Sequence, residues 1–407
     1  MLKKLTLFFL TASLAFTAGF GCKKGPEVDP QTRGITDTAI RIGQVGPLTG
    51  PASLWGAVAR GTDTYFKMIN DEGGIHGRKI EYFMRDDGYQ PFRTRTEVRR
   101  LVENEQVFAM IGGVGTATGM AVRDYLTENQ VPWIHPCTPS YHWTIPHNRF
   151  IFTIYPLAST ENMVLLDYAI DTLGMKKFAV IYQNDDYGKF GLHSAAVHLE
   201  SRGLKLAGAV SVETTDTDLS SHAMRLRDTG AEAVLLWVMP AHGATIVGQA
   251  EMIGFKTQWL TSSTLSDMEI MYNITNGRWK NVIIGNAIQH PSANHPLVNK
   301  YREASKKFAP NERFGMFYLA GFFFAETMVE AMRNAGPDLT VDKLIEEMEK
   351  ITDFQGIGPP LTYTETQRQA GNAIFLTRCI SATESVKLTD WRKAEMDLTE
   401  VLRRMKN

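Results

Sequence analysis

Reactive side chains gather around a histidine and a cysteine near the middle of the sequence. Cys137 follows His135 by two positions, and a thiol with an imidazole nearby resembles a nucleophile with its base. Neighbouring strand residues need not contact one substrate, so this pair alone does not indicate catalysis. We therefore predict that the protein is not an enzyme.

Metal chemistry is not indicated either. The other histidines show neither i, i+4 spacing with a glutamate nor a Cys-x-x-Cys partner, and the adjacent acids Asp185 and Asp186 supply too few oxygens for a hard cation. Such paired acids at the end of a strand are typical of a helix cap. We predict no metal and no cofactor.

A glycine-rich run offers a different chemistry. Gly112-Gly113-Val114-Gly115-Thr116-Ala117-Thr118-Gly119 follows a strand pattern and opens a helix pattern. Backbone N–H groups at a helix start, with hydroxyls beside them, favour a carboxylate. A dinucleotide loop is disfavoured because the next glycine has the wrong spacing and no acid ends the following strand. The run therefore predicts an anion site.

Strands and helices alternate along the chain, which predicts parallel sheets covered by helices. Strand patterns cover 39–45, 79–85, 107–111 and 131–134, and the alternation restarts after an irregular stretch at 136–156. With 407 residues, of which 43% are hydrophobic, the chain can bury two cores. Lys and Arg (43) nearly balance Asp and Glu (44), so no nucleic-acid partner is expected.

The N-terminus has the layout of an export signal. Lys3 and Lys4 precede an apolar run at 5–20, which is shorter than the ~20 apolar residues that span a bilayer. Cys22 directly after this run resembles the lipidated cysteine of bacterial lipoproteins, which implies an extracytoplasmic, membrane-anchored protein. The other cysteines, Cys137 and Cys379, are too few for a disulfide framework, and whether they pair is open.

Two motifs in this order are jointly specific. Gly46-Pro47-Leu48-Thr49-Gly50 leaves the first strand, and Asn70-Asp71-Glu72-Gly73-Gly74-Ile75-His76-Gly77 closes the first long helix. With Asp185-Asp186-Tyr187-Gly188 and Gly254-Phe255-Lys256, they resemble the leucine/isoleucine/valine-binding family of type I periplasmic binding proteins. The resemblance implies two doubly wound α/β lobes joined by a three-stranded hinge, with the ligand between them.

The expected division of the chain follows from this fold. We predict a signal segment at 1–22, a tether at 23–37, a first lobe at 38–157 and 289–364, a second lobe at 158–288 and 365–395, and a tail at 396–407.

The resemblance also implies the ligand contacts. It places an aromatic ring, Trp55, against the ligand and gives Thr116 the ligand carboxylate, with Ala117 and Thr118 close by. In a second segment proline occupies the expected threonine position, and proline has no hydroxyl and no N–H, so neighbouring residues must substitute. The remaining expected contacts are Cys137, Thr138 and Ser140 in that segment, and Tyr187, Met239 and Ser263 on the second lobe.

One departure from the family concerns the ligand ammonium. The acid that pairs with it in the family aligns near Ser263, and a buried ammonium without a carboxylate is costly. Either Asp185, Asp186 or Asp267 replaces that acid, or the ligand has no ammonium.

The expected function is the solute-binding component of an ABC importer of the branched-chain amino acid type. It captures a small amino acid or other carboxylate, acts as a monomer, and has an inner-membrane permease and ATPase as partners. The alternatives are a receptor for a non-amino carboxylate or amide, including aromatic ones, and a ligand-sensing subunit of a signalling system.

Overall fold

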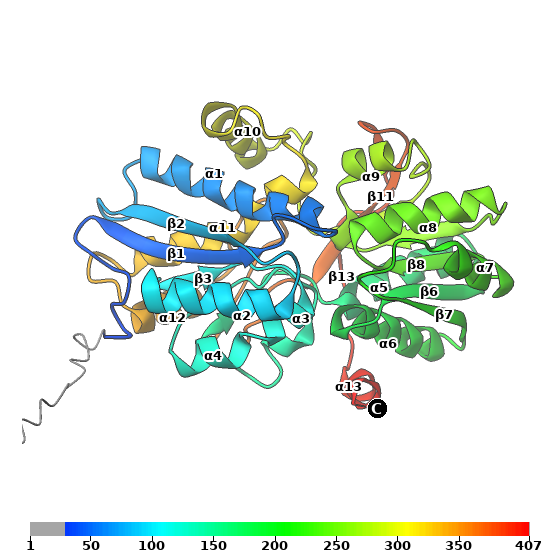
Figure 1. The fold of residues 1–407 in the computed structure, drawn as a ribbon, viewed down its shortest axis with the longest axis horizontal. Coiled ribbons are helices and arrows are strands. Elements are labelled where there is room, and N and C mark those ends of the chain that lie inside the picture. Colours follow the sequence, from blue (N-terminus) through cyan, green and yellow to red (C-terminus); the bar gives the residue numbers. More distant parts are fainter. Residues whose placement is uncertain (1–28, 407) are drawn as a thin grey trace, which may run out of the picture.

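Two α/β lobes lie side by side in the computed structural model, which describes residues 29–406 (Figure 1). The predicted signal segment and Cys22 lie outside these residues. The first lobe has a five-stranded parallel sheet in the order β2-β1-β3-β4-β5. Its strands are β1 (Ala39–Gly46), β2 (Lys79–Asp86), β3 (Ala109–Ile111), β4 (Trp133–Ile134) and β5 (Ile151–Phe152).

The second lobe has a larger sheet in the order β12-β11-β10-β9-β8-β6-β7. Strands β6 to β10 are parallel, whereas β11 runs antiparallel to β10 and also pairs with β13. The strands are β6 (Phe178–Gln183), β7 (Leu206–Val212), β8 (Ala233–Trp237), β9 (Gln258–Thr261), β10 (Ile283–Asn286), β11 (Ala373–Cys379), β12 (Ser385–Lys387) and β13 (Arg392–Lys393).

Helices cover both sheets. Those of the first lobe are α1 (Ala57–Asp71), α2 (Pro91–Arg99), α3 (Thr116–Met120), α4 (Arg123–Glu128), α10 (Pro296–Phe308), α11 (Met316–Asn334) and α12 (Val341–Glu349). Those of the second lobe are α5 (Ala158–Asp167), α6 (Asp186–Ser201), α7 (Ser220–Asp228), α8 (Pro240–Met252), α9 (Met268–Ile274) and α13 (Thr399–Met405). The predicted fold class of two doubly wound lobes is confirmed.

The chain crosses between the lobes three times, after β5, after β10 and before β11. The crossings are bonded to one another: Thr153 pairs with Gln369 as a parallel bridge, and the N–H of Gln289 donates to the carbonyl of Ile357 at 2.7 Å. The C-terminal stretch of the chain therefore completes both lobes, and the hinge has the three segments that were predicted.

Helices α1 and α11 approach closely and carry much of the cavity wall. A Cβ at Gly61 would lie 1.9 Å from the backbone oxygen of Tyr318, and a Cβ at Gly321 would lie 2.1 Å from that of Val58. Only glycine fits at these two crossing points, because any side chain would push the backbones apart. The close crossing brings the first turns of both helices to the gap between the lobes.

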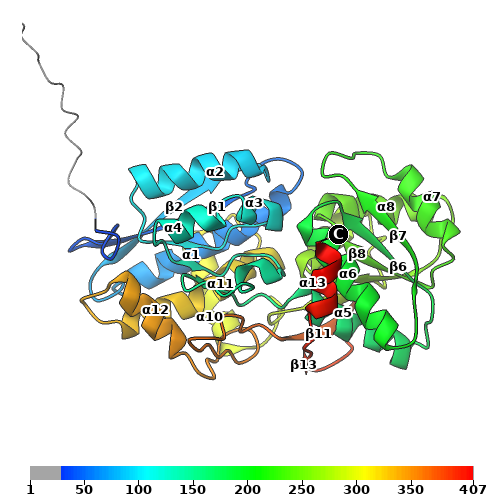
Figure 2. The ribbon, with the colours of Figure 1, turned by 90° about the horizontal axis from the view of Figure 1, so that it is seen from below.

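Two segments differ from the predictions. The tether predicted at 23–37 is wrong for its described part, because the carbonyl of Gln31 accepts from the N–H of Val341 and Arg33 donates to the carbonyl of Asn129 at 2.8 Å. The tail predicted at 396–407 contains helix α13, which lies beside α6 (Figure 2). Val401 is fully buried there, and Arg404 pairs with Glu200 on α6 at 2.7 Å. Apolar burial and this ion pair explain why the segment is ordered.

Candidate functional site

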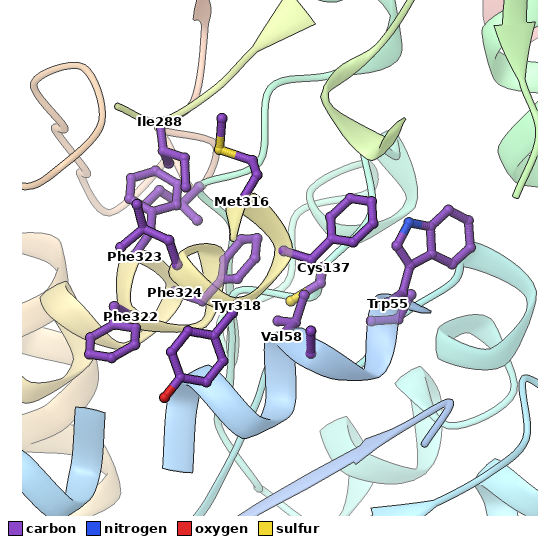
Figure 3. Packing of buried hydrophobic residues seen from close by; sticks show 14 of the residues in the cluster. Trp55, Val58, Cys137, Ile288, Met316, Tyr318, Phe322, Phe323 and Phe324 are labelled. Atoms are coloured by element: carbon purple, nitrogen blue, oxygen red, sulfur yellow. The ribbon is translucent and has the colours of Figure 1, made fainter. Parts of the chain in front are cut away.

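A cavity of about 680 Å³ lies between the lobes at the carboxyl ends of their strands. This is the crevice where open α/β sheets bind ligands. Aromatic rings dominate its wall, and apolar side chains of α1 and α11 form one side of it (Figure 3). Among the described residues, its lining contains no Asp, Glu, Lys, Arg or His. The aromatic members are Trp55, Tyr89, Tyr155, Tyr187, Phe317, Phe323 and Phe324.

Trp55 joins the two lobes. It lies in the 3-10 turn η1 (Ser53–Gly56) that leads from β1 into α1, and its indole Nε1 donates to the backbone carbonyl of Thr264 at 2.8 Å. The ring of Trp55 also stands edge-on to that of Tyr187, with centroids 6.4 Å apart. A first-lobe side chain thus bonds a second-lobe loop across the cavity, which is the geometry of a closed state.

The phenols of Tyr187 and Tyr89 have partners on the second lobe. The hydroxyl of Tyr187 lies 2.7 Å from Thr264 Oγ1, and that of Tyr89 accepts from Gln183 Nε2 at 3.2 Å. Because both hydroxyls are engaged, these rings offer the ligand mainly apolar and π surface. Tyr89 was not predicted, although it directly follows the Asp-Asp-Gly that ends β2, a position at the carboxyl edge of the sheet.

A buried glutamate stands behind the cavity wall. Ser263 lines the cavity from the 3-10 turn η5 (Ser263–Leu265), and Glu161 in the first turn of α5 accepts from its N–H at 2.6 Å and from its Oγ at 2.7 Å. The hydroxyl of Tyr155 lies 3.1 Å from the same Oγ. Burial raises the pKa of Glu161 to about 7, although its bonds to Ser263 act in the opposite direction.

Most of the chain matches one known protein family. A family model described as periplasmic binding protein matches residues 39–384, which is most of the chain. The chain belongs to the periplasmic binding protein family. The resemblance drawn from the Gly-Pro-x-Thr-Gly and Asn-x-x-Gly-Gly-Ile-x-Gly motifs is therefore confirmed, and so is the solute-binding role it implied. Membership also implies a location outside the cytoplasm.

Similar proteins agree with this assignment. Leu/Ile/Val-binding protein homolog 3 of Brucella melitensis is 26% identical over 359 residues, which cover 88% of this chain and 93% of that protein. A branched-chain amino acid ABC transporter structure from Thermus thermophilus, with bound valine, has a TM-score of 0.81 at 17% identity and covers 88% of this chain and 98% of its own. A fatty acid ABC transporter substrate-binding protein from Thermomonospora curvata has a TM-score of 0.82 at 23% identity, covering 90% and 95%.

In this periplasmic binding protein, five of the predicted ligand contacts line the cavity. They come from two separate segments of the first lobe and two of the second, and the fold brings them to one place. They are Trp55, Cys137, Thr138, Tyr187 and Ser263.

The threonines of the glycine-rich run at 112–119 do not line the cavity. Thr116 is fully buried, and its Oγ1 faces Thr138 Oγ1 at 2.8 Å, so it does not line the cavity in this arrangement, and its contact with a ligand carboxylate stays a prediction. Thr118 Oγ1 donates to the carbonyl of Val114 at 2.6 Å, as hydroxyls in helices commonly do. Ala117 does not line the cavity either, and the run contributes Val114 and Gly115 instead.

Ser140 and Met239 also lie away from the cavity. Ser140 accepts from the N–H of His142 and its hydroxyl lies 2.7 Å from Nδ1 of that ring, so it caps the 3-10 turn that follows. Met239 is fully buried at the start of α8. Thr138, two residues before Ser140, lines the wall instead.

None of the three acids suggested for the ligand ammonium lines the cavity. Asp185 caps α6 through the N–H of Gly188 at 3.2 Å, and Asp186, next to it, is not a lining residue either. Asp267 pairs with Arg313 and accepts from the N–H of Phe317 at 3.1 Å. Glu161 was missed, because a glutamate in the first turn of a helix is ordinarily a favourable end charge.

The surroundings of His135 and Cys137 indicate a role in the structure of the protein and not in catalysis. His135 is fully buried between the carbonyl of Phe324 at 2.6 Å and the hydroxyl of Tyr363 at 2.9 Å, and burial lowers its pKa to about 4. Burial also raises the pKa of the Cys137 thiol, which disfavours the nucleophilic thiolate. Cys137 and Cys379 are both free, so they do not pair.

Neither a metal site nor a membrane-spanning helix is present in residues 29–406. They contain no group of three or more His, Cys, Asp or Glu side chains placed to hold a metal ion. In this part of the chain, no helix combines the length and the apolar character needed to cross a membrane.

Proposed function

We propose that the protein captures a small amino acid or other carboxylate outside the cytoplasm and delivers it to an ABC importer of the branched-chain amino acid type. The observation that carries this is the cavity between the two lobes, across which Trp55 bonds Thr264. A closed state of this kind requires only differential contacts with the ligand and no chemical step. The similarity to a Leu/Ile/Val-binding protein homologue supports the amino acid class.

In this proposal the ligand packs against Trp55, meets Thr138 and Cys137 on the first lobe, and is covered by Tyr187 and Ser263 when the second lobe closes. All five line the cavity. The partners are an inner-membrane permease and its ATPase, and the protein acts as a monomer. It performs no turnover, so the ligand should be recovered unchanged after incubation, as mass spectrometry can establish.

The first experiment is a thermal-shift screen of the chain from Lys23 onward. The library contains amino acids, aliphatic and aromatic carboxylates, and amides. A ligand that binds only the folded state raises the melting temperature by mass action, by an amount that grows with its concentration over Kd. A shift with leucine, isoleucine or valine supports the amino acid class, whereas no shift with any member refutes the proposed function.

A second candidate function is the binding of a non-amino carboxylate or amide, including aromatic ones. The observation that favours it is the lining of seven aromatic residues without a charged side chain. A melting-temperature shift with aromatic acids or amides but with no amino acid would select it. A ligand-sensing role would instead require that closure be read by a signalling partner rather than by a permease.

Membrane anchoring through Cys22 is a further part of the proposal. The supporting feature is the position of Cys22 directly after the apolar run at 5–20. Mass spectrometry of the protein from membranes should find an acylated N-terminal cysteine, and Cys22→Ser should release the protein into the soluble extract. An unmodified wild-type protein in that extract would contradict the anchor.

A further inference from the structure

Glu161 and Ser263 form a closed pair at the polar corner of the cavity. Both oxygens of the Glu161 carboxylate are committed to one residue, since Oε2 accepts from the N–H of Ser263 at 2.6 Å and Oε1 accepts from its Oγ at 2.7 Å. Glu161 itself is fully buried. Strand β10 leaves room for it with Gly285, where a Cβ would lie 3.0 Å from Oε2.

This pairing fixes which way the Ser263 hydroxyl points. A hydroxyl has one proton and two lone pairs, and the proton of Ser263 is directed at Glu161. The Oγ can therefore only accept from the cavity. Tyr155, which also lines the cavity, has its hydroxyl 3.1 Å from the same Oγ and is the donor of that bond, so one lone pair of the Oγ remains for a solute. The ring of Tyr155 stacks on Phe324 at a centroid distance of 5.8 Å.

We propose that Glu161 is a positioning residue that holds Ser263 as a hydrogen-bond acceptor, so that the site selects solutes carrying an N–H donor, an ammonium or an amide, on an apolar body. The inference rests on the proposed function and adds the recognition of one end of the ligand. Recognition works through Ser263, because Glu161 does not itself line the cavity. The apolar body of the solute is matched by the aromatic wall.

Among the described residues, no charged side chain pairs with Glu161. The titratable groups that face it are the phenols of Tyr155, from the first crossing, and Tyr187, from α6, and the pKa of each is raised by burial, so both stay neutral. Strands β10 and β11 bring Gly285 and Ile374 to this place, and η5 brings Ser263.

Protonation of Glu161 would change the Ser263 hydroxyl from a hydrogen-bond acceptor to a donor toward the cavity. The pKa of Glu161 is raised to about 7 by burial, so the carboxylate predominates at pH 8.5 and the acid at pH 5.5. A protonated carboxyl donates to Ser263 Oγ, which frees the serine proton for the cavity. The preference for donor-bearing solutes should therefore be strong at pH 8.5 and weak at pH 5.5.

The test uses pairs of probes with the same apolar body. L-leucine is compared with 4-methyl-2-oxopentanoate, and phenylacetamide with phenylacetate, by calorimetry on the wild-type protein at both pH values. At pH 8.5 the donor-bearing member of a pair should bind about tenfold more tightly, as expected for one well-placed hydrogen bond in a buried site.

Glu161→Gln should remove this preference. The glutamine oxygen can still accept from the N–H of Ser263, while its N–H₂ donates to Ser263 Oγ, which imitates the protonated acid at every pH. The preference should fall below about threefold and no longer change with pH. The matched control is Glu326→Gln, another fully buried glutamate whose carboxylate bonds Tyr301 and Ile357 outside the cavity. It should keep the wild-type preference.

The outcomes separate the two proposals. An unchanged preference in Glu161→Gln, or equal binding of both members of each pair to the wild-type protein at pH 8.5, overturns the inference and leaves the proposed function intact. No binding of any probe overturns the proposed function and the inference with it. If Glu161→Gln does not fold, the wild-type protein decides, because a preference that stays the same from pH 5.5 to pH 8.5 also overturns the inference.

Discussion

The indole nitrogen of Trp55 donates a 2.8 Å hydrogen bond to the carbonyl of Thr264, 209 residues further along the chain and on the opposite lobe. Both groups are buried. Because opening of the lobes separates them, this bond exists only in the closed state. The bond therefore stabilises the closed state relative to the open state. Because the ligand is held in the closed state, this stabilisation also increases the affinity for the ligand.

Trp55→Phe should weaken binding of the solute found in the thermal-shift screen by about fivefold. Phenylalanine keeps an aromatic ring but has no N–H, so the closed state loses one buried hydrogen bond of about 1 kcal/mol. Calorimetry measures the change. The control is Trp133→Phe, which removes a matched 2.7 Å bond from an indole to the carbonyl of Gly112 within the first lobe. Equal losses of affinity in both variants would contradict a role for Trp55 in closure.

The sequence predicted the elements well because their signals are local. The strand predicted at 39–45 is β1, and the strand predicted at 79–85 is β2. Each depends on the hydrophobic period and on nearby Gly and Pro residues. The same local pattern predicted too long a strand at 107–111, where β3 covers only Ala109–Ile111.

The site was predicted in part, for a physical reason. Trp55 and Tyr187 follow strand ends, and every parallel strand end lies at the same edge of its sheet. The hydrogen bonds between Ser263 and Glu161 connect residues 102 positions apart, and no sequence pattern around either residue predicts them. The direction in which a side chain points cannot be predicted from the sequence either. Thr116 was therefore predicted to contact the ligand, although its hydroxyl points toward Thr138.

A second interlobe contact links α9 with the start of α11. Asp267, only 1% exposed, pairs with Arg313 of the first lobe and accepts from the N–H of Phe317 at 3.1 Å. Arg313 also pairs with Glu269 at 2.9 Å. Arg313→Gln should leave a buried carboxylate without its cation, which disfavours closure and weakens solute binding by about tenfold or more. Small-angle scattering should show a larger radius of gyration.

The control for Arg313 is an ion pair within one lobe. Arg149 lies 2.7 Å from Asp342, and both side chains are about half exposed. Arg149→Gln should leave affinity and radius of gyration unchanged, because exposed pairs contribute little and this one does not span the gap. A wild-type radius of gyration in Arg313→Gln would show that the contact does not hold the lobes together.

Stability should fall as the pH rises past the usual range of a glutamate. Burial raises the pKa of Glu326 from 4.5 to about 8, so between these values the folded protein binds more protons than the unfolded chain. In that window the free energy of unfolding decreases with pH, by at most about 5 kcal/mol for this group. Glu326→Gln should flatten the dependence, as urea denaturation at pH 5 and pH 8.5 measures.

Two checks accompany the Glu326 prediction. The glutamine oxygen can still accept from the hydroxyl of Tyr301, which lies 2.7 Å from the wild-type carboxylate, so the fold should be kept. At pH 8.5 the variant should be more stable than the wild-type protein, since it has no buried charge there. A variant that loses stability with pH as steeply as the wild-type protein would show that other groups cause the fall, Glu161 being the first to examine by the same substitution.

The close crossing of α1 and α11 should tolerate no side chain at Gly61. A Cβ there would lie 1.9 Å from the backbone oxygen of Tyr318, so Gly61→Ala must separate the helices and should lower the free energy of unfolding by about 2 to 3 kcal/mol. Gly248 on α8 has no atom within 4 Å of its added Cβ, and Gly248→Ala should instead stabilise the protein by about 0.5 to 1 kcal/mol through helix propensity. Urea denaturation distinguishes the two. Similar stabilities of both variants would mean that the helices can move apart at little cost, and the cavity wall they form would then be adaptable.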